Sequence, residues 1–519
     1  MPRNTSQPNL PRKGPNPYKY SGGQWLRNNA AHQAVRHISF NFDALCRQVV
    51  KFCPAADSVS THEKKEGGFN RVFIFTTNNG RTIVAKLPFS NAGPRRLTTE
   101  SEVATIEFLR KHSEIPIPTI YDWCDDESNE IGSEYIIMEP APGVSLHSKW
   151  AEMTIEQRVQ CIKNICQLLS SIDDVRFPAY GSLYTTDDQP ECAIILPEDD
   201  RFCVGPHVAT RYWDCNVGDR RYYDLQRPPP NRGPWTDLSS WSDGLIDAGV
   251  SRVPPALLDN DQECRPSYFG TPDMHLQVLQ EGRLLLRTMS KDPRIRTVAD
   301  PTLSHPDLNM RNIFVNSDDP TKVASFIDRQ SASLGPAFWV VADTRPDFAT
   351  LPDDSTDEGT VMCAKVFDLF MGSYCPQWAR ARSLDERLVR PFLYPHRTWN
   401  DGVVAFQYDL SMTSKEWDDL GFQEKCPVST PGSEKFAAHE REYPYFVAAQ
   451  RLRKHVKDYL CISSDGWVPE EAWDAIQLQH QQLYSDVVQA ILSAAEAEND
   501  PDEPIKTERD LKAIWPFDL

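Results

Sequence analysis

The sequence lacks two features that would mark a membrane protein or a zinc protein. None of its apolar runs approaches the roughly 18 residues that a membrane-spanning helix needs, so we expect no membrane span. None of its 13 cysteines forms a Cys-x-x-Cys pair, which argues against a zinc site of the usual spacing. An odd, scattered set of cysteines indicates reduced thiols and a reducing compartment.

Positive charge is scarce as well. The chain has 55 Lys and Arg against 74 Asp and Glu, a net charge of −19. Proteins that bind nucleic acid cluster Lys and Arg instead, so we expect no nucleic-acid partner. An anionic ligand such as ATP would need a local basic spot or a bound cation.

Acidic residues are missing from the N-terminus. The segment before Asp43 has no Asp or Glu, whereas its basic residues include Arg3, Arg12, Lys13, Lys19, Arg27 and Arg36. This charge bias is typical of an organellar transit peptide. Five prolines between Pro2 and Pro17 would break the amphipathic helix of such a peptide. Residues 1–43 are therefore predicted as a basic, proline-rich arm, either a targeting segment or simply disordered.

Residues 44–141 are predicted to form a β-rich lobe with one helix. Val72–Phe75 and Thr82–Ala85 are strand-like, and Asn79-Gly80 between them is a strong hairpin signal. Gly67-Gly68 precedes the first strand, and Lys86 ends the second. A helix follows at 99–111, where Thr99 and Glu102 fit a capping box. Two further strands are expected within 114–124 and 134–146.

Residues 142–519 are predicted to be mainly helical. Helices are expected at 154–172, where Thr154 and Gln157 fit a capping box, at 273–289 and at 470–497. The stretch from about 197 to 255 is rich in Pro, Trp, Asp and Arg and is predicted to be an insertion with little regular structure. Its Trp and Arg side chains could serve packing or shape a substrate pocket. The acidic tail at 496–504 is expected to be solvated.

One loop concentrates polar side chains between two apolar runs. His305, Asp307 and Asn312 follow the pattern H-x-D-x-x-x-x-N, and Asp328 comes 16 positions after Asn312. Strands at 312–315 and 323–327, with a turn at 318–320, would return Asp328 to the side of Asn312. In phosphoryl transfer one Asp accepts or orients the proton of the attacking hydroxyl, while an Asn and a second Asp hold Mg²⁺. His305 is expected to bond the loop backbone.

The remaining parts of a phosphotransfer site also occur, in the same chain order. A Gly turn such as Gly67-Gly68 lets backbone N–H groups approach phosphates. Lys86 would pair with the phosphates of ATP, oriented by Glu102 on the next helix, although Glu100 is close by. These residues predict a nucleotide site between two lobes.

At these residues the sequence resembles a known family. The segments "LSHPDLNMRNIFV" and "ASFIDRQ" are similar to the catalytic loop and metal-binding Asp of the aminoglycoside phosphotransferase (APH) family. The segments "YSGGQWLRN", "FNRVFIF" and "WPFD" resemble a fungal branch of it, altered inheritance of mitochondria protein 9. The resemblance covers about residue 20 to the C-terminus.

The resemblance implies an α+β, two-lobed, protein-kinase-like fold with a catalytic loop at 303–330. It implies Asp307 as catalytic base, Asn312 and Asp328 as ligands of Mg²⁺, and Lys86 with Glu102 at the phosphates of ATP. The hinge that holds adenine would be Met138, Glu139 and Ala141. The branch also implies a mitochondrial location, with the cytoplasm as the alternative.

Three departures from related kinases matter. Pro306 stands where protein kinases usually have Arg, and no Ala-Pro-Glu segment follows Asp328, so a protein kinase is disfavoured. Arg329 stands where the branch usually has Trp. Its cation could compete with Mg²⁺ or point outward and bind an anion. The Gly turn has no G-x-G-x-x-G.

Two functions follow as hypotheses. The first is ATP- and Mg²⁺-dependent transfer of phosphate to a hydroxyl of a small molecule. The second is a non-catalytic, kinase-like protein that serves mitochondrial maintenance through protein contacts. The Asp307, Asn312 and Asp328 set favours the enzyme, whereas Arg329 and the loose Gly turn favour the alternative.

Overall fold

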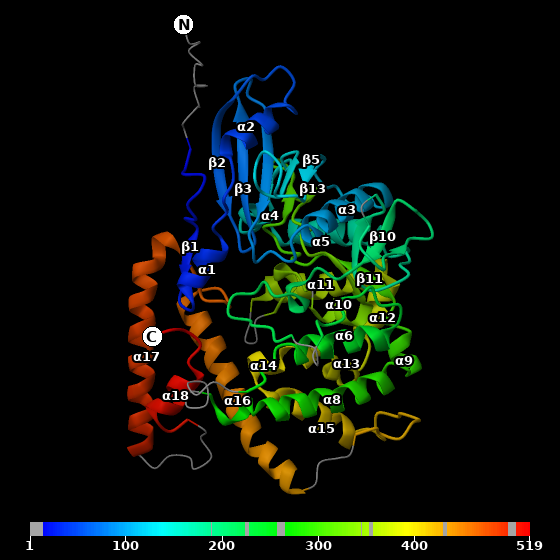
Figure 1. The fold of residues 1–519 in the computed structure, drawn as a ribbon, viewed down its shortest axis with the longest axis vertical. Coiled ribbons are helices and arrows are strands. Elements are labelled where there is room, and N and C mark those ends of the chain that lie inside the picture. The colour runs from blue at the N-terminus through cyan, green and yellow to red at the C-terminus, as the bar shows by residue number, and fades with distance from the viewer. Residues whose placement is uncertain are drawn as a thin grey trace.

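The protein has two lobes. A computed structural model describes residues 14–187, 189–223, 228–256, 265–343, 345–351, 357–428, 433–496 and 505–519. Figure 1 shows a sheet with β2 and β3 above a larger body of helices. The predicted α+β, two-lobed, kinase-like fold class is therefore confirmed.

The N-lobe is built on a five-stranded antiparallel sheet in the order β2-β3-β4-β6-β5. The strands are β2 (Val59–Glu66), β3 (Asn70–Thr77), β4 (Thr82–Pro88), β5 (Ile120–Cys124) and β6 (Tyr135–Met138). The hairpin predicted at Asn79-Gly80 joins β3 to β4, and Gly80 has a positive φ of 80° that suits this tight turn. Phe73, Phe75 and Ile83 face one side of the sheet and are buried, as period-two alternation requires.

Two helices pack against this sheet. They are α2 (Phe42–Val50), whose Leu45 and Val49 are fully buried, and α3 (Leu97–His112). The capping box predicted for α3 is wrong, because the helix begins two residues earlier. The Thr99 hydroxyl instead donates to the Glu134 carboxylate at 2.6 Å. Glu102 is thereby free of the capping role and lies inside the helix, buried.

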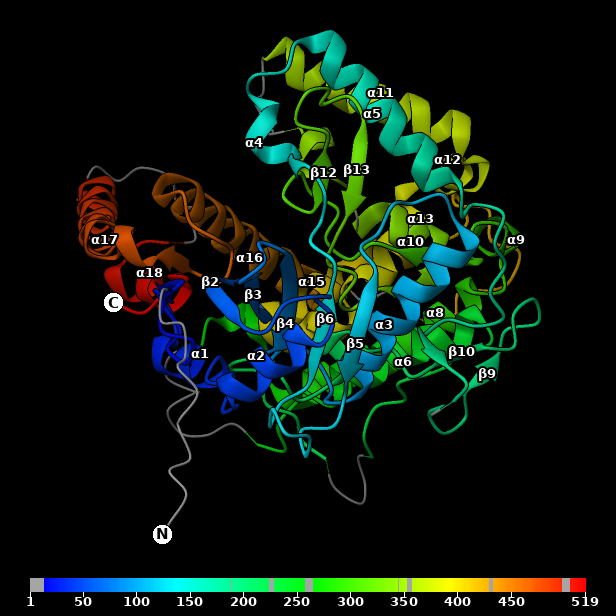
Figure 2. The same ribbon diagram turned by 90° about the horizontal axis from the view of Figure 1, so that it is seen from above.

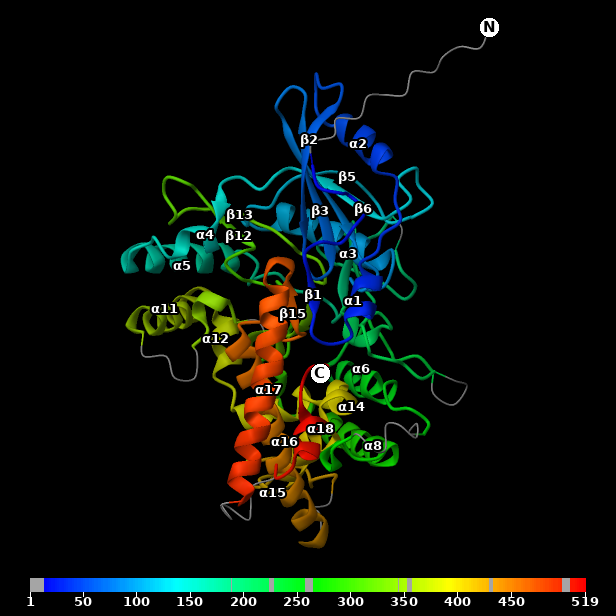
Figure 3. The same cartoon turned by 90° about the vertical axis from the view of Figure 1, so that its left-hand side faces the viewer.

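The segment predicted to be a disordered arm is folded from Tyr20 onward, so that prediction is wrong for these residues. Strand β1 (Gly23–Trp25) pairs antiparallel with β15 (Trp467–Pro469), and α1 (Asn29–Val35) follows. Figure 3 shows β1 beside β15 and near α17. Trp25 donates its indole N–H to Asp465 at 2.9 Å. Residues 1–13 lie outside the described part of the chain.

The C-lobe begins with β7 (Val144–Ser145), α4 (Leu146–Trp150) and α5 (Ile155–Ser170). The predicted capping box of Thr154 and Gln157 is confirmed at the start of α5. Figure 2 shows α5 beside α11 (Glu358–Tyr374). Together these elements form one arm of the C-lobe, with a core that includes Ile162 and Phe367.

The insertion predicted as irregular holds regular structure, so this prediction is wrong in part. It contributes β10 (Phe202–Gly205), a 3₁₀ turn η1 (Thr210–Tyr212) and α6 (Leu238–Val250). Strand β10 lies between β8 (Ser182–Thr185) and β9 (Ile194–Ile195). Trp235 and Trp241 are buried at 1% and 2% exposure, which shows that the tryptophans serve packing.

Four short strands frame the loop at 303–330. They form two antiparallel pairs, β11 (Pro301–Ser304) with β14 (Ser333–Pro336) and β12 (Ile313–Val315) with β13 (Val323–Phe326). The predicted hairpin after Asn312 is confirmed, with Ile313 opposite Phe326. The pairing of β12 with β13 brings Asn312 and Asp328, at the two ends of the hairpin, close together.

Helices complete the C-lobe. In chain order these elements are η2 (Ser267–Phe269), α8 (Pro272–Met289), α9 (Pro293–Arg296), α10 (Ala337–Asp343), η3 (Asp347–Ala349), α12 (Pro376–Arg382), α13 (Glu386–Leu393), η4 (Pro395–Arg397), α14 (Thr398–Asp401), α15 (Val403–Lys415), α16 (Ser433–Leu460), η5 (Glu470–Ala472), α17 (Trp473–Glu496) and α18 (Glu508–Ile514). The helices predicted near 273–289 and 470–497 are α8 and α17. Most of the acidic tail lies outside the described residues. Within the described ranges, no helix has both the length and the apolar character that a bilayer crossing demands.

Candidate nucleotide and metal site

Lys86, Glu102 and Asp328 meet although they are far apart in the chain. The Lys86 Nζ lies 2.8 and 2.9 Å from the two carboxylate oxygens of Glu102 on α3. It also lies 2.8 Å from Asp328 Oδ1, which is 242 positions away and belongs to the segment after β13. One ion network therefore joins the N-lobe sheet, its helix and the C-lobe.

This network is largely withdrawn from water. The side chains of Lys86 and Glu102 are 8% and 3% exposed, while that of Asp328 is 38% exposed. Burial acts to lower the pKa of Lys86, but the carboxylates of Asp328 and Glu102 outweigh it and raise that pKa. Lys86 is therefore a fixed positive charge, because an ammonium between two carboxylates is favoured over the neutral amine.

The loop that carries Asp307 is tied down by its own polar side chains. His305 accepts the backbone N–H of Asp307 at Nδ1 (3.2 Å), and its Nε2 lies 3.1 Å from the carbonyl oxygen of Ile327. Burial and then the charge of Arg329 hold the pKa of His305 well below its usual value. His305 is a neutral ring that bonds the loop backbone, as predicted.

Asp307 itself is exposed and hydrogen-bonded on both carboxylate oxygens. The side-chain amide of Asn309 donates to Oδ1 at 2.7 Å, and that of Asn312 donates to Oδ2 at 3.0 Å. These two donors fix the orientation of the carboxylate. A carboxylate held in this way can accept a proton from a hydroxyl that approaches from solvent.

Asn312 and Asp328 lie at adjacent ends of the β12–β13 hairpin. Ile327, which precedes Asp328, donates its backbone N–H to the carbonyl of Asn312 at 3.0 Å. Asp328 has a φ of 63°, a left-handed conformation that is uncommon for a residue with a side chain. The hairpin thus places the two residues together at a strained turn.

The oxygens left on Asn312 and Asp328 suit Mg²⁺. Within the described residues, Asn312 Oδ1 and Asp328 Oδ2 have no hydrogen-bond partner, since the contacts above use the other polar atoms. Mg²⁺ prefers oxygen ligands and is usually bound through one or two protein groups plus phosphates and water. The donor set therefore fits the ion.

Arg329 does not point outward, so the alternative of an outward-pointing, anion-binding side chain is wrong. It is 3% exposed, and its guanidinium carbon lies 5.8 Å from the centre of the Phe326 ring. Burial lowers its pKa to about 9. Among the described residues, Asp328 has an ion pair with Lys86 and none with Arg329. The guanidinium therefore lies in the protein interior near Phe326.

Sequence reasoning missed a second link between the lobes. The side-chain amides of Asn70 on β3 and Gln330 exchange two hydrogen bonds, of 2.8 and 3.0 Å, and both residues are buried. Gln330 lies two residues after Asp328, and Asn70 directly follows the Gly turn. In the sequence, this contact was indicated only by the positions of the two residues, Asn70 near the Gly turn and Gln330 near Asp328.

The Gly turn between β2 and β3 is closed by a hydrogen bond from Gly67 N–H to the Asn70 carbonyl, 3.0 Å long. A Cβ on Gly67 or Gly68 would meet no atom within 4 Å. The Gly68 carbonyl accepts from Arg36 at 2.9 Å and from Asn91 at 3.2 Å. The folded N-terminal segment therefore braces this turn.

The predicted hinge follows β6. Met138 ends that strand, and Glu139 donates its backbone N–H to Thr119 at 2.8 Å. The Glu139 carboxylate also accepts from the Thr119 hydroxyl at 3.1 Å. Among the described residues, the backbone N–H of Ala141 has no backbone partner. The segment Met138–Ala141 thus spans the junction of the two lobes with a free donor.

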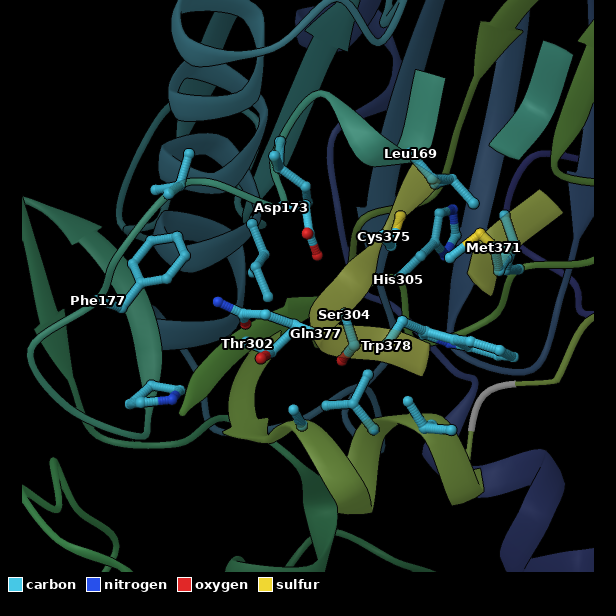
Figure 4. Close-up of a pocket in the computed structure, with 18 of the residues that line it drawn as sticks. Leu169, Asp173, Phe177, Thr302, Ser304, His305, Met371, Cys375, Gln377 and Trp378 are labelled. Carbon is cyan, nitrogen blue, oxygen red and sulfur yellow. The ribbon is translucent and has the colours of Figure 1, made fainter. Parts of the chain in front are cut away.

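An apolar cavity of about 110 Å³ adjoins the catalytic loop. Ser304, His305 and Leu308 line it from the loop, and Phe367, Met371 and Trp378 line it from α11 and α12. Figure 4 shows His305 and Ser304 among these side chains. A predominantly apolar pocket beside a few polar groups is the usual form of a small-molecule site.

Fold and site together define a protein of the two-lobed, protein-kinase-like class. A family model described as the phosphotransferase enzyme family (APH) matches residues 65–221, which include most of the N-lobe sheet and the start of the C-lobe. The resemblance to the APH family predicted from the sequence is therefore confirmed.

The chain is also similar to fungal proteins over most of its length. A subtelomeric hrmA-associated cluster protein of Aspergillus fumigatus is 26% identical over 477 residues, 82% of this chain and 92% of the relative. Altered inheritance of mitochondria protein 9, mitochondrial, of Yarrowia lipolytica is 20% identical over 88% of this chain and 85% of the relative. The solved streptomycin–ATP complex of APH(2″)-IIa matches 71% of this chain and 97% of its own at 12% identity and a TM-score of 0.36.

Proposed function

We propose that the protein transfers the terminal phosphate of ATP to a hydroxyl group of a small molecule, with Mg²⁺. The observation that carries the proposal is the convergence of Lys86, Glu102 and Asp328 beside the loop of Asp307. Phosphoryl transfer depends on positioning and on neutralising charge, and this constellation supplies both. The family match over residues 65–221 supports the same reaction class.

The roles follow from the contacts. Lys86 would hold the phosphates of ATP, with Glu102 keeping the ammonium in place. The turn at Gly67 and Gly68 would cover the phosphates, because no side chain blocks the approach of a ligand there. Met138, Glu139 and Ala141 would hold the adenine ring at the hinge.

Asn312 and Asp328 would hold Mg²⁺ through the oxygens that the hairpin leaves unpaired. The ion would neutralise negative charge on the phosphates. Asp307 would orient the acceptor hydroxyl and take its proton, since the amides of Asn309 and Asn312 hold its carboxylate in a fixed orientation. His305 would take no proton and serve only to shape the loop.

The place of action that we propose is the mitochondrion. The relative from Yarrowia lipolytica is named mitochondrial, and the first 42 residues carry basic and no acidic side chains. A fluorescent fusion of the full chain that co-localises with a mitochondrial marker would support this. An even cytosolic signal would contradict it.

The test of the reaction is a screen of the purified full chain against a library of hydroxyl compounds, with Mg²⁺ and ATP. We expect at least one compound to gain the mass of a phosphate group as ADP forms. If Mg·ATP binds but no library member is phosphorylated, the non-catalytic alternative gains support. If Mg·ATP does not bind, the proposed function is wrong.

A further inference from the structure

A second, smaller cavity adjoins the catalytic loop on the side of the insertion. Its volume is about 30 Å³, and its lining includes His207, Arg211, Tyr212, Ser304, Ser333 and Trp339. Ser304 directly precedes His305 and also lines the apolar cavity described above. The insertion therefore contributes side chains to a polar cavity beside Ser304, the last residue of the strand that leads into the loop of Asp307.

Arg211 is the charged group of this cavity. Its guanidinium carbon lies 5.5 Å from the centre of the Trp339 ring. Within the described part of the chain, its side chain makes no hydrogen bond and no ion pair, and no Asp or Glu lines the cavity. A half-buried guanidinium without an anion is a ready binding partner for one.

The neighbouring arginines differ from Arg211 because each is already engaged. Arg221 donates to the carbonyl of Ala248 at 3.0 Å and to the Ser251 hydroxyl at 2.7 Å. Arg252 donates to Asp219 at 2.9 Å, and Arg397 donates to Asp401 at 2.7 Å. Arg211 thus stands out within a positively charged region of a chain whose net charge is −19.

Two neutral donors stand beside Arg211. His207 accepts the backbone N–H of Ala209 at Nδ1 (3.1 Å), so its neutral ring carries the proton on Nε2. Burial and then Arg211 hold the pKa of His207 well below its usual value. Burial raises the pKa of Tyr212 to about 12, so its hydroxyl keeps its proton. The cavity therefore offers a cation and two donors to a single acceptor group.

The small volume of this cavity limits which anion can bind. A water molecule needs roughly 10–15 Å³ of such space, so about two oxygen-sized positions fit. Two oxygens in a plane are the acceptors of a carboxylate, which a guanidinium binds in a bidentate manner. A phosphate group presents more oxygens and needs more room.

We propose that this cavity recognises a carboxylate and that the acceptor of the phosphotransferase is a hydroxy acid. The inference rests on the proposed function and deepens it. With the carboxylate at Arg211 and the carbon skeleton against Ser304, the hydroxyl group of the acid lies toward the loop that carries Asp307. Trp339 and Tyr212 shield the ion pair from water and strengthen it.

The binding test uses the full chain without ATP. Ligand-observed NMR titrations would compare lactate, glycerate and malate with lactamide, glyceramide and malamide, their uncharged counterparts. We expect binding of at least one acid to be at least about tenfold tighter than binding of its amide. Arg211→Gln should abolish that difference and Arg211→Lys should restore part of it. Arg220→Gln, at an exposed arginine of the same insertion, should keep it.

The outcomes separate the two proposals. Equal binding of acids and amides, no binding of either, or an unchanged preference in Arg211→Gln overturns the carboxylate site. Binding of glycerol 3-phosphate without binding of any acid overturns the choice of a carboxylate. Mg·ATP binding, measured separately on each variant, reports folding and the nucleotide site. If the wild type does not bind Mg·ATP, the proposed function is contradicted. The titration with acids and amides still tests whether the cavity binds a carboxylate.

Discussion

Lys86 and Arg211 are cations in the two lobes, and they stand in opposite electrostatic situations. Lys86 is buried against two carboxylates that reach it from α3 and from the segment after β13. Arg211 lies half-buried at a cavity and, among the described residues, has an aromatic ring as its neighbour and no anion. The charge of Lys86 is neutralised by carboxylates of the protein, whereas that of Arg211 has no neutralising partner among the described residues.

This difference explains which of the two cations can be identified from the sequence. A paired buried charge needs partners at fixed positions, and a sequence motif records those positions. An unpaired charge at a cavity is recorded by no motif, because its partner is not part of the chain. The ion network of Lys86, Glu102 and Asp328 could therefore be predicted from the sequence, whereas the position of Arg211 at a cavity could be seen only in the fold.

Replacement of Asp307, the proposed general base, is expected to have the largest effect. We expect Asp307→Asn to lower the rate of phosphotransfer by about 10³-fold, because general base catalysis typically contributes 10²–10⁴. Mg·ATP binding should persist. Asp318→Asn, in the exposed turn of the same hairpin, is the control. A rate within twofold of wild type in Asp307→Asn would assign the base elsewhere.

Removal of the paired cation should cost stability. Lys86→Met leaves Glu102 buried without its partner, so we expect the free energy of unfolding to fall by about 3 kcal/mol. Urea denaturation measures it. Lys65→Met, at a side chain 67% exposed on β2, should change it by less than about 0.5 kcal/mol. Similar losses in both variants would show that the network does not stabilise the fold.

Replacement of Arg329 should have the opposite effect and increase stability. Its Nε and Nη2 are buried without a hydrogen-bond partner in the described residues, and a desolvated guanidinium of this kind costs free energy. We expect Arg329→Met to raise the free energy of unfolding by about 1 kcal/mol and to leave Mg·ATP affinity unchanged. A loss of stability or of metal-dependent binding would give Arg329 an active part in the site.

The smallest expected effect concerns the amide pair. Asn70→Ala, Gln330→Ala and the double variant form a cycle, and we expect a coupling energy of about 1 kcal/mol in unfolding. Weaker Mg·ATP binding should accompany each single change, because the pair positions the segment of Asp328. Gln423→Ala, an exposed amide, is the control. A coupling energy of zero would mean that the two amides act independently.

Several parts of the fold could be predicted because their signals are local. The hairpin at Asn79-Gly80 needs only a turn dipeptide between alternating strands, and the cap of α5 needs only Thr154 and Gln157. The hairpin from Asn312 to Asp328 followed from two β-rich runs and a turn.

The failures share a cause in tertiary structure. Helix α3 begins at Leu97, before Thr99, whose hydroxyl donates to Glu134, so Thr99 forms no capping box. The segment predicted as an arm folds because β1 pairs with β15, more than 400 residues away. The Trp-rich insertion looked irregular because its tryptophans are buried against residues of α8 and α10, which lie outside the insertion. Arg211 and the Asn70–Gln330 pair have no sequence signature, since both depend on contacts between distant segments.

The most direct test of the central claim is Mg²⁺-dependent binding of ATP, measured by isothermal titration calorimetry on the full chain and on Asp328→Ala. If Lys86, Asn312 and Asp328 form one nucleotide and metal site, ATP binds the wild type more tightly with Mg²⁺ than with EDTA. That gain disappears in Asp328→Ala, while the control Asp318→Ala keeps it. Equal ATP affinity with Mg²⁺ and with EDTA in the wild type, or an unchanged gain in Asp328→Ala, would contradict the account.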